Sequence, residues 1–312
     1  MRDILILFYN TMWGQPLPFA EEPLPHGCTI TFDRNRLMEA DAVIFHIPDL
    51  FRIIGDDEIC KKDGQIWVGW CLECEENYPI LKNEEFRELF DLWMGYHSSD
   101  DIPYPYYLDY STRMESRMPD IPFSERNEIC MLISSGINRS GRREVVSELM
   151  KLTSIDSYGK LFNNKSISHD AGRESAIEIM RHYKFVIAFE NAIANDYVTE
   201  KFYNPLYAGA IPIYLGAPNV CEFAPSINCY IDVTDYPSID SLYTDIRQIG
   251  IDESKWNSYR LLGAYEQNPA FRSKLQSLDY NPIFRLSQKI KDVIIHGAEK
   301  RLKLGDGCNS LS

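Results

Sequence analysis

A phenol, a carboxylate and an ammonium group lie close together near the middle of the chain, as Tyr197, Glu200 and Lys201. Two apolar runs flank them, at residues 184–189 and 211–215, and predict two parallel strands joined by a helix. Thr199 is suited to cap this helix and Gly209 to end it. The end of a parallel strand, where a helix begins, commonly binds phosphate groups. The segment therefore predicts a nucleotide diphosphate site in which Lys201 neutralises phosphate charge.

Transfer of a sugar from such a nucleotide needs further positive charge to hold the departing diphosphate. The sequence has no Asp-x-Asp pair on a strand-end loop that would hold a metal ion for this purpose. Arg142 follows a predicted strand at 129–133 and a polar loop that contains Ser135, and it opens the next predicted helix. This junction is expected at the same sheet edge as Lys201, so both side chains can converge on one diphosphate. Arg139 and Arg143 are the competing cations, and the register favours Arg142.

The other polar residues of this region each have a chemical and a structural interpretation. Tyr197 can contact a nucleotide, or it can be a core residue at the start of the helix. Glu200 can support the positive charge that develops on a transferred sugar, or it can pair with Lys201 and the helix dipole. Asn191 lies at the strand end, where we expect it to order the loop of the donor site.

A proton acceptor for the transfer is expected in the first half of the chain. Residues 67–79 follow a predicted strand and carry three carboxylates, Glu73, Glu75 and Glu76. Glu73 follows Leu72 and lies near Trp70, so partial desolvation would make it the best base of the three. A shift in register would give this role to Glu75 or Glu76, and a solvated acidic loop without a catalytic role is a further alternative.

The composition favours a globular protein of two domains. The chain has 312 residues, of which 45% are hydrophobic. The net charge of −14 argues against a nucleic-acid partner, although a few local cations can still bind one nucleotide. The eight cysteines are irregularly spaced and do not predict a disulfide framework. Cys71 and Cys74 lack a second ligand pair at zinc spacing, so we expect two buried thiols.

Strand and helix signals alternate along the chain. In the first half we expect strands at Ile4–Phe8, Ala42–His46 and 65–69, and helices at 34–40 and 84–93. The last of these helices is predicted from the spacing of the apolar residues Phe86, Leu89, Phe90 and Trp93. In the second half we expect a strand at 129–133 and helices at 142–151 and 172–182. A proline-rich stretch precedes the domain boundary, which we place near Arg126.

Residues 189–219, with the sequence FENAIANDYVTEKFYNPLYAGAIPIYLGAPN, resemble the donor-binding signature of the α1,3/4-fucosyltransferases, which are inverting enzymes that use GDP-fucose. Weaker similarity extends to the segments that contain Arg142 and Leu72-Glu73. Two positions depart from the family pattern. Gly136 lies where the family usually has asparagine, and His97 lies in a stretch where relatives carry two arginines. These departures put one phosphate or ribose contact and some acceptor contacts in question.

The resemblance implies an α/β protein of GT-B fold, in which two Rossmann-like domains face each other across a cleft. In the family, the glutamate that matches Glu73 is the catalytic base and the arginine that matches Arg142 contacts phosphate. We therefore predict a catalytic pair and a donor-binding group. The catalytic pair is Glu73 and Glu200, and the donor-binding group is Arg142, Lys201, Tyr197, Asn191 and Ser135.

The implied activity is transfer of L-fucose from GDP-fucose to a galactose/N-acetylglucosamine-containing oligosaccharide of the N-acetyllactosamine type, as in Lewis antigen-type glycans. The linkage is α1,3 or α1,4, formed with inversion in a single displacement. No cofactor is expected, and stimulation by Mn²⁺ or Mg²⁺ stays open. One alternative is a transferase of the same fold that uses another nucleotide sugar. The other is a carbohydrate-binding protein without catalytic activity.

We predict an acceptor-binding domain at residues 1–125, a GDP-fucose-binding domain at 126–282, and a C-terminal helix or tail at 283–312 that packs back across the domain junction. The sequence shows no signal peptide and no apolar run of the ~20 residues that a membrane span requires. A bacterial cytoplasmic enzyme is therefore expected, although a trimmed Golgi enzyme would look the same. The basic tail predicts a weak peripheral contact with membranes.

Overall fold

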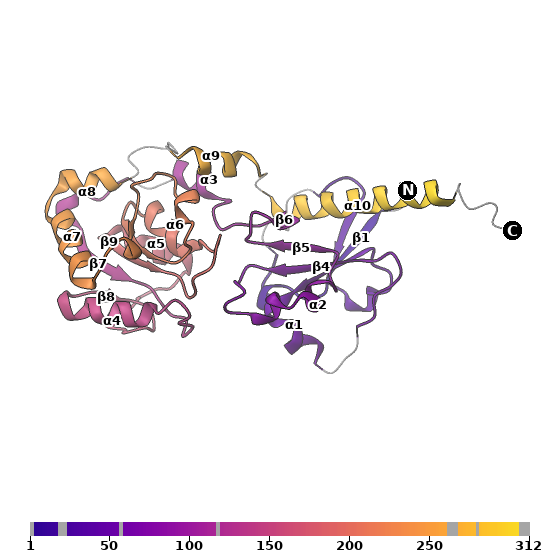
Figure 1. The fold of residues 1–312 in the computed structure, drawn as a ribbon, viewed down its shortest axis with the longest axis horizontal. Helices are drawn as coiled ribbons and strands as arrows, with labels where there is room; N and C mark the ends of the chain where they lie inside the picture. The colour runs from indigo at the N-terminus through magenta and orange to yellow at the C-terminus, as the bar shows by residue number, and fades with distance from the viewer. Residues whose placement is uncertain are drawn as a thin grey trace. The chain divides into compact units, whose positions relative to one another are not determined.

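The computed structural model describes residues 3–17, 24–55, 59–116, 119–260, 268–278 and 281–305. These residues form two compact units (Figure 1). The first unit comprises the described residues of Met1–Tyr104 and of Asp279–Ser312, and the second comprises those of Pro105–Leu278. Each unit is built around its own parallel sheet.

The first unit contains a six-stranded sheet in the order β2-β1-β3-β4-β5-β6, and every neighbouring pair is parallel. Its strands are β1 (Ile4–Phe8), β2 (Cys28–Thr31), β3 (Ala42–His46), β4 (Ile66–Cys71), β5 (Leu92–Gly95) and β6 (Ile102–Pro103). The central strands are apolar on both faces because helices cover both sides of the sheet. All these strands end at one edge, which therefore carries the loops that follow β1, β3, β4 and β5.

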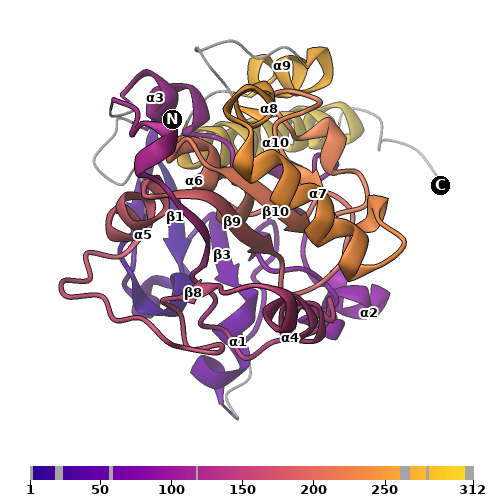
Figure 2. The same cartoon turned by 90° about the vertical axis from the view of Figure 1, so that its left-hand side faces the viewer.

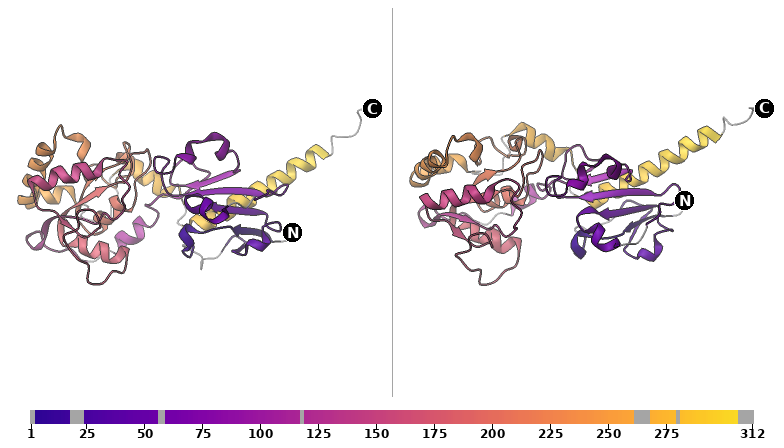
Figure 3. Two further views of the ribbon diagram at one scale, coloured as in Figure 1. Left: turned by 90° about the horizontal axis from the view of Figure 1, so that it is seen from below. Right: turned by 60° about the horizontal axis from the view of Figure 1, so that its bottom comes forward.

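Different segments cover the two faces of this sheet. One face packs against the long helix α10 (Pro282–Gly305), whose Ile283, Leu286 and Ile290 are buried against β-strand residues such as Ile44 and Trp70. Figure 3 shows α10 along the sheet of this unit. The other face is covered by short helical segments: α1 (Ile47–Ile54), η3 (Pro79–Lys82) and α2 (Glu84–Arg87). The turns η1 (Met12–Gly14) and η2 (Arg34–Arg36) complete the unit.

The second unit contains a five-stranded parallel sheet in the order β11-β10-β9-β7-β8. Its strands are β7 (Asn127–Met131), β8 (Asp156–Ser157), β9 (Tyr183–Phe189), β10 (Ile211–Leu215) and β11 (Ile231–Asp232). The predicted strand at 211–215 is confirmed at both ends, and β9 begins one residue earlier than predicted. The prediction that Gly209 ends the intervening helix is also confirmed, because this glycine has a φ of 70° just after the helix.

Alternate residues of β7, β9 and β10 face two layers of helices (Figure 2). One layer consists of α4 (Arg142–Leu152), α7 (Ile239–Ile251) and α8 (Glu253–Tyr259). The other consists of α5 (Arg173–Arg181) and α6 (Glu200–Tyr207), with α3 (Tyr110–Glu115) and α9 (Pro269–Gln276) packed beside them. The short turns η4 (Phe123–Glu125), η5 (Val220–Glu222) and η6 (Val233–Asp235) connect these elements.

Two predicted helices of the first unit are wrong in extent. The helix expected at 84–93 ends at Arg87, and β5 begins at Leu92. Leu92 and Trp93 are both buried, on opposite faces of the sheet, which a strand allows and the predicted amphipathic helix does not. The helix expected at 34–40 is only the 3₁₀ turn η2.

The segment 105–125, which the sequence analysis assigned to the first domain, lies within the second unit. Tyr107 and Tyr110 explain this position, since both are buried in an aromatic cluster with Tyr203 of α6 and Phe271 of α9. The C-terminal helix or tail predicted at 283–312 contains the helix α10, and the buried residues of α10 belong to the first unit's core.

Candidate functional site

Two strand-to-helix junctions of the second unit bring Arg142 and Lys201 to one sheet edge. The strands β7 and β9 are parallel neighbours, and each leads through a polar loop into a helix. Arg142 is the first residue of α4 and Lys201 is the second residue of α6. The two side chains are close enough for the charge of Arg142 to act on Lys201. Arg142 and Lys201 therefore meet at the edge where phosphate binding was predicted.

Arg142 ties the two loops of this edge together. Its Nη2 donates to the carbonyls of Ser135 at 2.9 Å and Ile137 at 2.8 Å, and its Nη1 donates to the carbonyl of Phe189 at 3.2 Å. The residue is only 1% exposed, and burial lowers the pKa of its guanidinium although the charge of Glu190 opposes this. All three acceptors are uncharged, and Arg142 forms no ion pair with the residues that the structure describes. A buried cation held in this way favours an anionic ligand.

Lys201 lies in a compact group with Glu200, Glu190 and Thr199. Its Nζ is 2.9 Å from Oε1 of Glu200, 3.1 Å from Oγ1 of Thr199 and 3.6 Å from Oε2 of Glu190. Burial opposes protonation of Lys201, but the charges of Glu200 and Glu190 outweigh it and raise the pKa of the ammonium group. Lys201 therefore stays charged, and its side chain keeps 26% of its surface exposed toward solvent.

Glu190 also belongs to this edge, although it is not among the site residues predicted from the sequence. It is fully buried and accepts hydrogen bonds at 2.8 Å from both the backbone N–H and the hydroxyl of Thr199. Burial raises the pKa of Glu190 to about 7, although the nearby Lys201 acts in the opposite direction. Because Thr199 caps α6, Glu190 fixes the helix start from which Lys201 projects. A carboxylate at the end of an otherwise apolar strand was the available signal.

The remaining predicted donor-binding residues differ in exposure. Tyr197 is buried, and its ring lies 6.4 Å from that of Tyr106. Asn191 is buried too, and its carbonyl accepts from the backbone N–H groups of Arg139 at 2.8 Å and Ser140 at 3.2 Å. Ser135 is exposed, and the side chain of Glu200 is 43% exposed. Partial burial works against ionisation of Glu200, but Lys201 outweighs it and lowers the pKa of that carboxyl.

In the first unit, Glu73 lies just beyond the carboxyl end of β4. Its side chain is half-buried, and its Oε2 accepts from the amide of Asn77 at 3.4 Å. It lines a pocket of about 490 Å³ together with residues from the ends of β4 and β5 and from α2. These lining residues include Cys71, Glu75, Trp93, Tyr96, His97 and Asp100. The prediction that Cys71 and Cys74 are buried free thiols is confirmed.

The two competing carboxylates are each held by other side chains. Oε2 of Glu75 accepts from the hydroxyl of Tyr96 at 2.7 Å and lies 3.5 Å from Nε2 of His97. The hydrogen bond with His97 lowers the pKa of Glu75 to about 2, with burial opposing it and Tyr96 assisting. Glu76 forms an ion pair with Lys82 at 2.6 Å. Glu75 is thus held ionised and Glu76 is engaged by Lys82, which favours Glu73 as the base among the three. The catalytic role of Glu73 stays a prediction.

Two segments of the chain match models of fucosyltransferase domains. Residues 123–291 match the C-terminal domain of glycosyltransferase family 10 (fucosyltransferase), and residues 1–107 match the fucosyltransferase N-terminal domain. The chain belongs to glycosyltransferase family 10. The family 10 chain is 29% identical over 80% of its length to "Alpha-(1,3)-fucosyltransferase B" of Drosophila melanogaster. It is 34% identical over 75% of its length to "GDP-fucose protein O-fucosyltransferase 3" of Homo sapiens.

The chain spans 60% and 52% of the length of these two relatives. Solved structures support the fold of the family 10 chain. A crystal structure of an α1,3-fucosyltransferase with GDP-fucose matches with a TM-score of 0.60 and 16% identity, over 93% of this chain and 90% of the other. A second α1,3-fucosyltransferase structure matches with a TM-score of 0.59 and 19% identity, over 88% of both chains. The predicted α/β GT-B fold with two Rossmann-like domains is confirmed.

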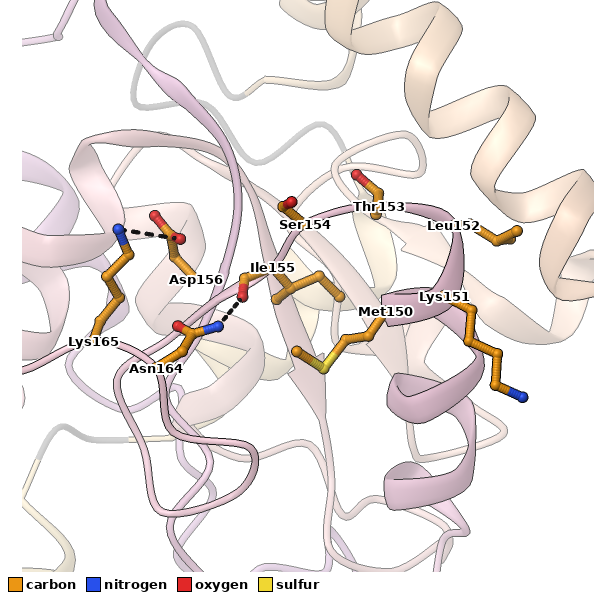
Figure 4. Close-up of a pocket in the computed structure, with 9 residues that line it drawn as sticks. All are labelled: Met150, Lys151, Leu152, Thr153, Ser154, Ile155, Asp156, Asn164 and Lys165. Atoms are coloured by element: carbon orange, nitrogen blue, oxygen red, sulfur yellow. Dashed lines mark hydrogen bonds and ion pairs between the residues drawn. The ribbon is translucent and has the colours of Figure 1, made fainter.

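A second pocket of the family 10 protein lies apart from these residues. It has a volume of about 620 Å³ and is formed by the C-terminal end of α4, β8 and the segment with Asn164 and Lys165 (Figure 4). Two of its polar groups already bind each other, because Lys165 pairs with Asp156 at 3.4 Å. It lies at the opposite end of α4 from Arg142 and contains none of the predicted site residues.

Two kinds of feature are absent from the described residues. In that part of the chain, no group of three or more histidine, cysteine, aspartate or glutamate residues could hold a metal ion. Nor does any helix there have the length and apolarity to cross a membrane. The predictions about metal stimulation and about a peripheral membrane contact stay predictions, and the outer end of the basic tail lies outside the described residues.

Proposed function

We propose that this family 10 protein transfers L-fucose from GDP-fucose to a hydroxyl group of an acceptor, with inversion in a single displacement. The observation that carries the proposal is the buried guanidinium of Arg142, which lacks an ion pair among the described residues, beside the ammonium of Lys201. Two such cations at neighbouring helix starts suit a diphosphate. Support comes also from the relatives, which are named for GDP-fucose or for fucosyl transfer.

In the proposed reaction, Arg142 and Lys201 bind the diphosphate and stabilise the negative charge that grows on it as the sugar leaves. Glu200, next to Lys201, supports the positive charge that develops on fucose. Tyr197, Asn191 and Ser135 shape the donor site around the nucleotide. Glu73 removes the proton from the acceptor hydroxyl as its oxygen attacks the anomeric carbon. No metal ion takes part in these steps, and whether Mn²⁺ or Mg²⁺ stimulates transfer is part of the test.

For the acceptor, we propose an oligosaccharide with galactose and N-acetylglucosamine, fucosylated in α1,3 or α1,4 linkage. The likeness to Drosophila α-(1,3)-fucosyltransferase B supports a sugar acceptor. A hydroxyl of a protein side chain is the second candidate, because the human relative carries the name of a protein O-fucosyltransferase. The cytoplasmic location and the bacterial source are proposals without support from these relatives, which are animal proteins.

The decisive experiment incubates the protein with GDP-fucose and a panel of N-acetyllactosamine-type oligosaccharides, unfolded peptides and folded protein domains, with and without Mn²⁺. Mass spectrometry detects fucosylated products and NMR gives the linkage. A thermal-shift series with GDP, UDP and CMP tests the nucleotide, since only a ligand that binds the folded protein stabilises it. Stabilisation by UDP or CMP but not by GDP would overturn the proposal, as would GDP binding without transfer to any acceptor class.

A further inference from the structure

A buried polar group lies at the carboxyl edge of the first unit's sheet and has no role in the proposed reaction so far. It consists of Asn10 after β1, His46 at the end of β3, and Asp49 in the first turn of α1. Nδ1 of His46 lies 2.5 Å from Oδ1 of Asp49. Asn10 joins them, because its Nδ2 donates to the His46 carbonyl at 2.8 Å and to Oδ1 of Asp49 at 2.9 Å. Its Oδ1 accepts from the His46 backbone N–H at 2.9 Å.

This group costs free energy that apolar residues of similar size would avoid. His46 and Asp49 are only 1% and 3% exposed. Oδ2 of Asp49 and Nε1 of the neighbouring Trp70 are buried and have no hydrogen-bond partner among the described residues. The largely exposed guanidinium of Arg52 lies 3.6 Å from Oδ2 of Asp49. Incompletely satisfied buried polar groups are uncommon in native proteins, and functional sites are among the places where they occur.

The group is placed to act on the strand end that carries Glu73. His46 pairs with Trp70 in the register of β3 and β4, and the two rings lie 5.1 Å apart in an edge-to-face arrangement. Trp13 contacts the imidazole as well, with ring centroids 5.2 Å apart. Glu73 follows Trp70 by three residues, where the chain leaves the sheet.

Electrostatic interactions place the same residues in one neighbourhood. Burial lowers the pKa of His46, while the charges of Asp49 and Glu73 oppose this shift. Burial raises the pKa of Tyr78, and Glu73 and Asp49 both add to that increase. The imidazole is therefore expected to be neutral at pH 7, with Nδ1–H donating to Asp49. Its orientation is fixed by that hydrogen bond and by the two tryptophan rings.

We propose that His46 is a positioning residue for fucosyl transfer: Asp49 and Asn10 hold its imidazole against Trp70, and this contact fixes the end of β4 from which Glu73 reaches the acceptor. The inference rests on the proposed function of Glu73. A general base must lie within hydrogen-bond reach of the proton it removes, and a displacement of about 1 Å can cost roughly 100-fold in rate. GDP binding should not depend on this group, because the predicted donor-binding residues all belong to the second unit.

The test compares kcat at saturating GDP-fucose and acceptor for His46→Ala, Asp49→Ala and Asp49→Asn in the full chain. We expect the two alanine variants to lose about 10- to 100-fold in kcat, with the GDP dissociation constant within about twofold of wild type. Asp49→Asn keeps an acceptor oxygen for the His46 ring, so it should recover most of kcat. Isothermal titration calorimetry with GDP measures donor binding and gives the fraction of folded protein.

A matched control comes from the other end of the same strand. Gln65 is buried next to β4 and donates to the carbonyls of Leu37 at 2.7 Å and Ala40 at 3.0 Å. Gln65→Ala should lower the melting temperature to a similar degree and leave kcat within twofold. A kcat near wild type in His46→Ala, or an equal loss of kcat in Gln65→Ala, would show that the group has only a structural role.

Two further outcomes can be distinguished: a variant that does not fold, and a wild-type protein that transfers no fucose. If His46→Ala does not fold, Asn10→Ala removes the hydrogen bonds of Asn10 to the His46 backbone and to Asp49 and leaves the direct contact of His46 with Asp49 in place. Asn10→Ala must then lower kcat with GDP affinity unchanged for the inference to hold. If the wild-type protein binds GDP but transfers no fucose, the proposed function fails first. In that case the inference about His46 is overturned with it, whatever the variants do.

Discussion

The carboxyl edges of the two sheets are built alike but carry different charges. In the second unit, Arg142 and Lys201 lie around one buried carboxylate, that of Glu190. In the first unit the edge carries Glu73, Glu75 and Asp49, with a buried histidine among them. Both edges follow from parallel strands that end on the same side. The fold therefore has two sheet edges of the kind at which ligands commonly bind, and the local side chains determine which chemistry each edge suits.

The comparison also explains how a protein of net charge −14 can present an anion site. The cations of the second unit are held by backbone carbonyls and by buried acceptors, so their charge is concentrated at one edge. The first unit's edge carries Glu73, the proposed proton acceptor, instead. Removing a charge from one edge should therefore affect a different step from removing a charge from the other.

The largest effect is expected for Glu73→Gln. If Glu73 is the base, kcat should fall by roughly 100-fold or more, since general base catalysis contributes about 10²–10⁴-fold. The dissociation constant for GDP should stay within twofold, as measured by calorimetry, because the edge with the cations is unchanged. Glu76→Gln is the control, because Glu76 is already paired with Lys82 and should keep nearly full kcat. If Glu73→Gln lost as much GDP affinity as is expected for Arg142→Ala, the two edges would not have the separate roles proposed for them.

The next effect concerns the cations. Arg142→Ala should weaken GDP binding by about 10- to 100-fold, the range expected when a charged hydrogen-bond donor is lost. Arg142→Lys should not restore binding, since an ammonium group cannot donate to three carbonyls in a fixed planar arrangement. Arg143→Ala removes the neighbouring and more exposed arginine and should change GDP affinity by less than twofold. A similar loss of affinity in Arg143→Ala would mean that the register assigned to this loop is wrong.

The two edges also differ in how well the sequence predicts them. The local structure of the second unit's edge was predicted well because its signals follow one another along the chain. These signals are a strand, a capping Thr199, a first-turn Lys201 and a helix end at Gly209. Glu190 was missed because its importance comes from full burial, which depends on packing between β9, β10 and α6. Its sequence neighbourhood shows only one acidic residue after an apolar strand.

The first unit was harder because its contacts join distant segments. The group of His46, Asp49 and Asn10 brings together residues 36 and 39 positions apart, and no local pattern indicates this. The helix expected at 84–93 was wrong for a related reason. A helical spacing fits Phe86, Phe90 and Trp93. In the structure, however, Trp93 belongs to the strand β5, and its ring packs against those of Phe86 and Phe90 across a turn. The local sequence fits a helix and a strand about equally well here, and tertiary packing determines that a strand forms.

A smaller effect should appear in the pH dependence of stability at the second unit's edge. Burial raises the pKa of Glu190 from its ordinary value of 4.5 to about 7. The folded protein then holds this proton more tightly than the unfolded chain does. The stabilisation is complete below pH 4.5 and is lost as the pH rises through 7. Relative to Glu190→Gln, wild type should therefore lose about 1–3 kcal/mol between pH 4.5 and 8 in urea unfolding. A constant difference between the two proteins across this range would contradict the buried position of Glu190.

The smallest effect is expected at the first unit's edge, for Glu75→Gln. His97 lowers the pKa of Glu75 to about 2, with burial opposing it and Tyr96 assisting, so the folded protein favours the ionised form. This stabilisation is present above pH 4.5 and is lost as the pH falls through 2, which is the opposite sign to Glu190. Glu75 is 28% exposed, so we expect the variant to lose only about 0.5–1 kcal/mol at pH 7. Urea unfolding at pH 7, 5 and 3.5 should show this loss shrinking toward acid, with Glu76→Gln as the control for removal of an exposed pair. If the loss instead grew toward acid, the two edges would titrate in the same direction and would not be the electrostatic opposites described above.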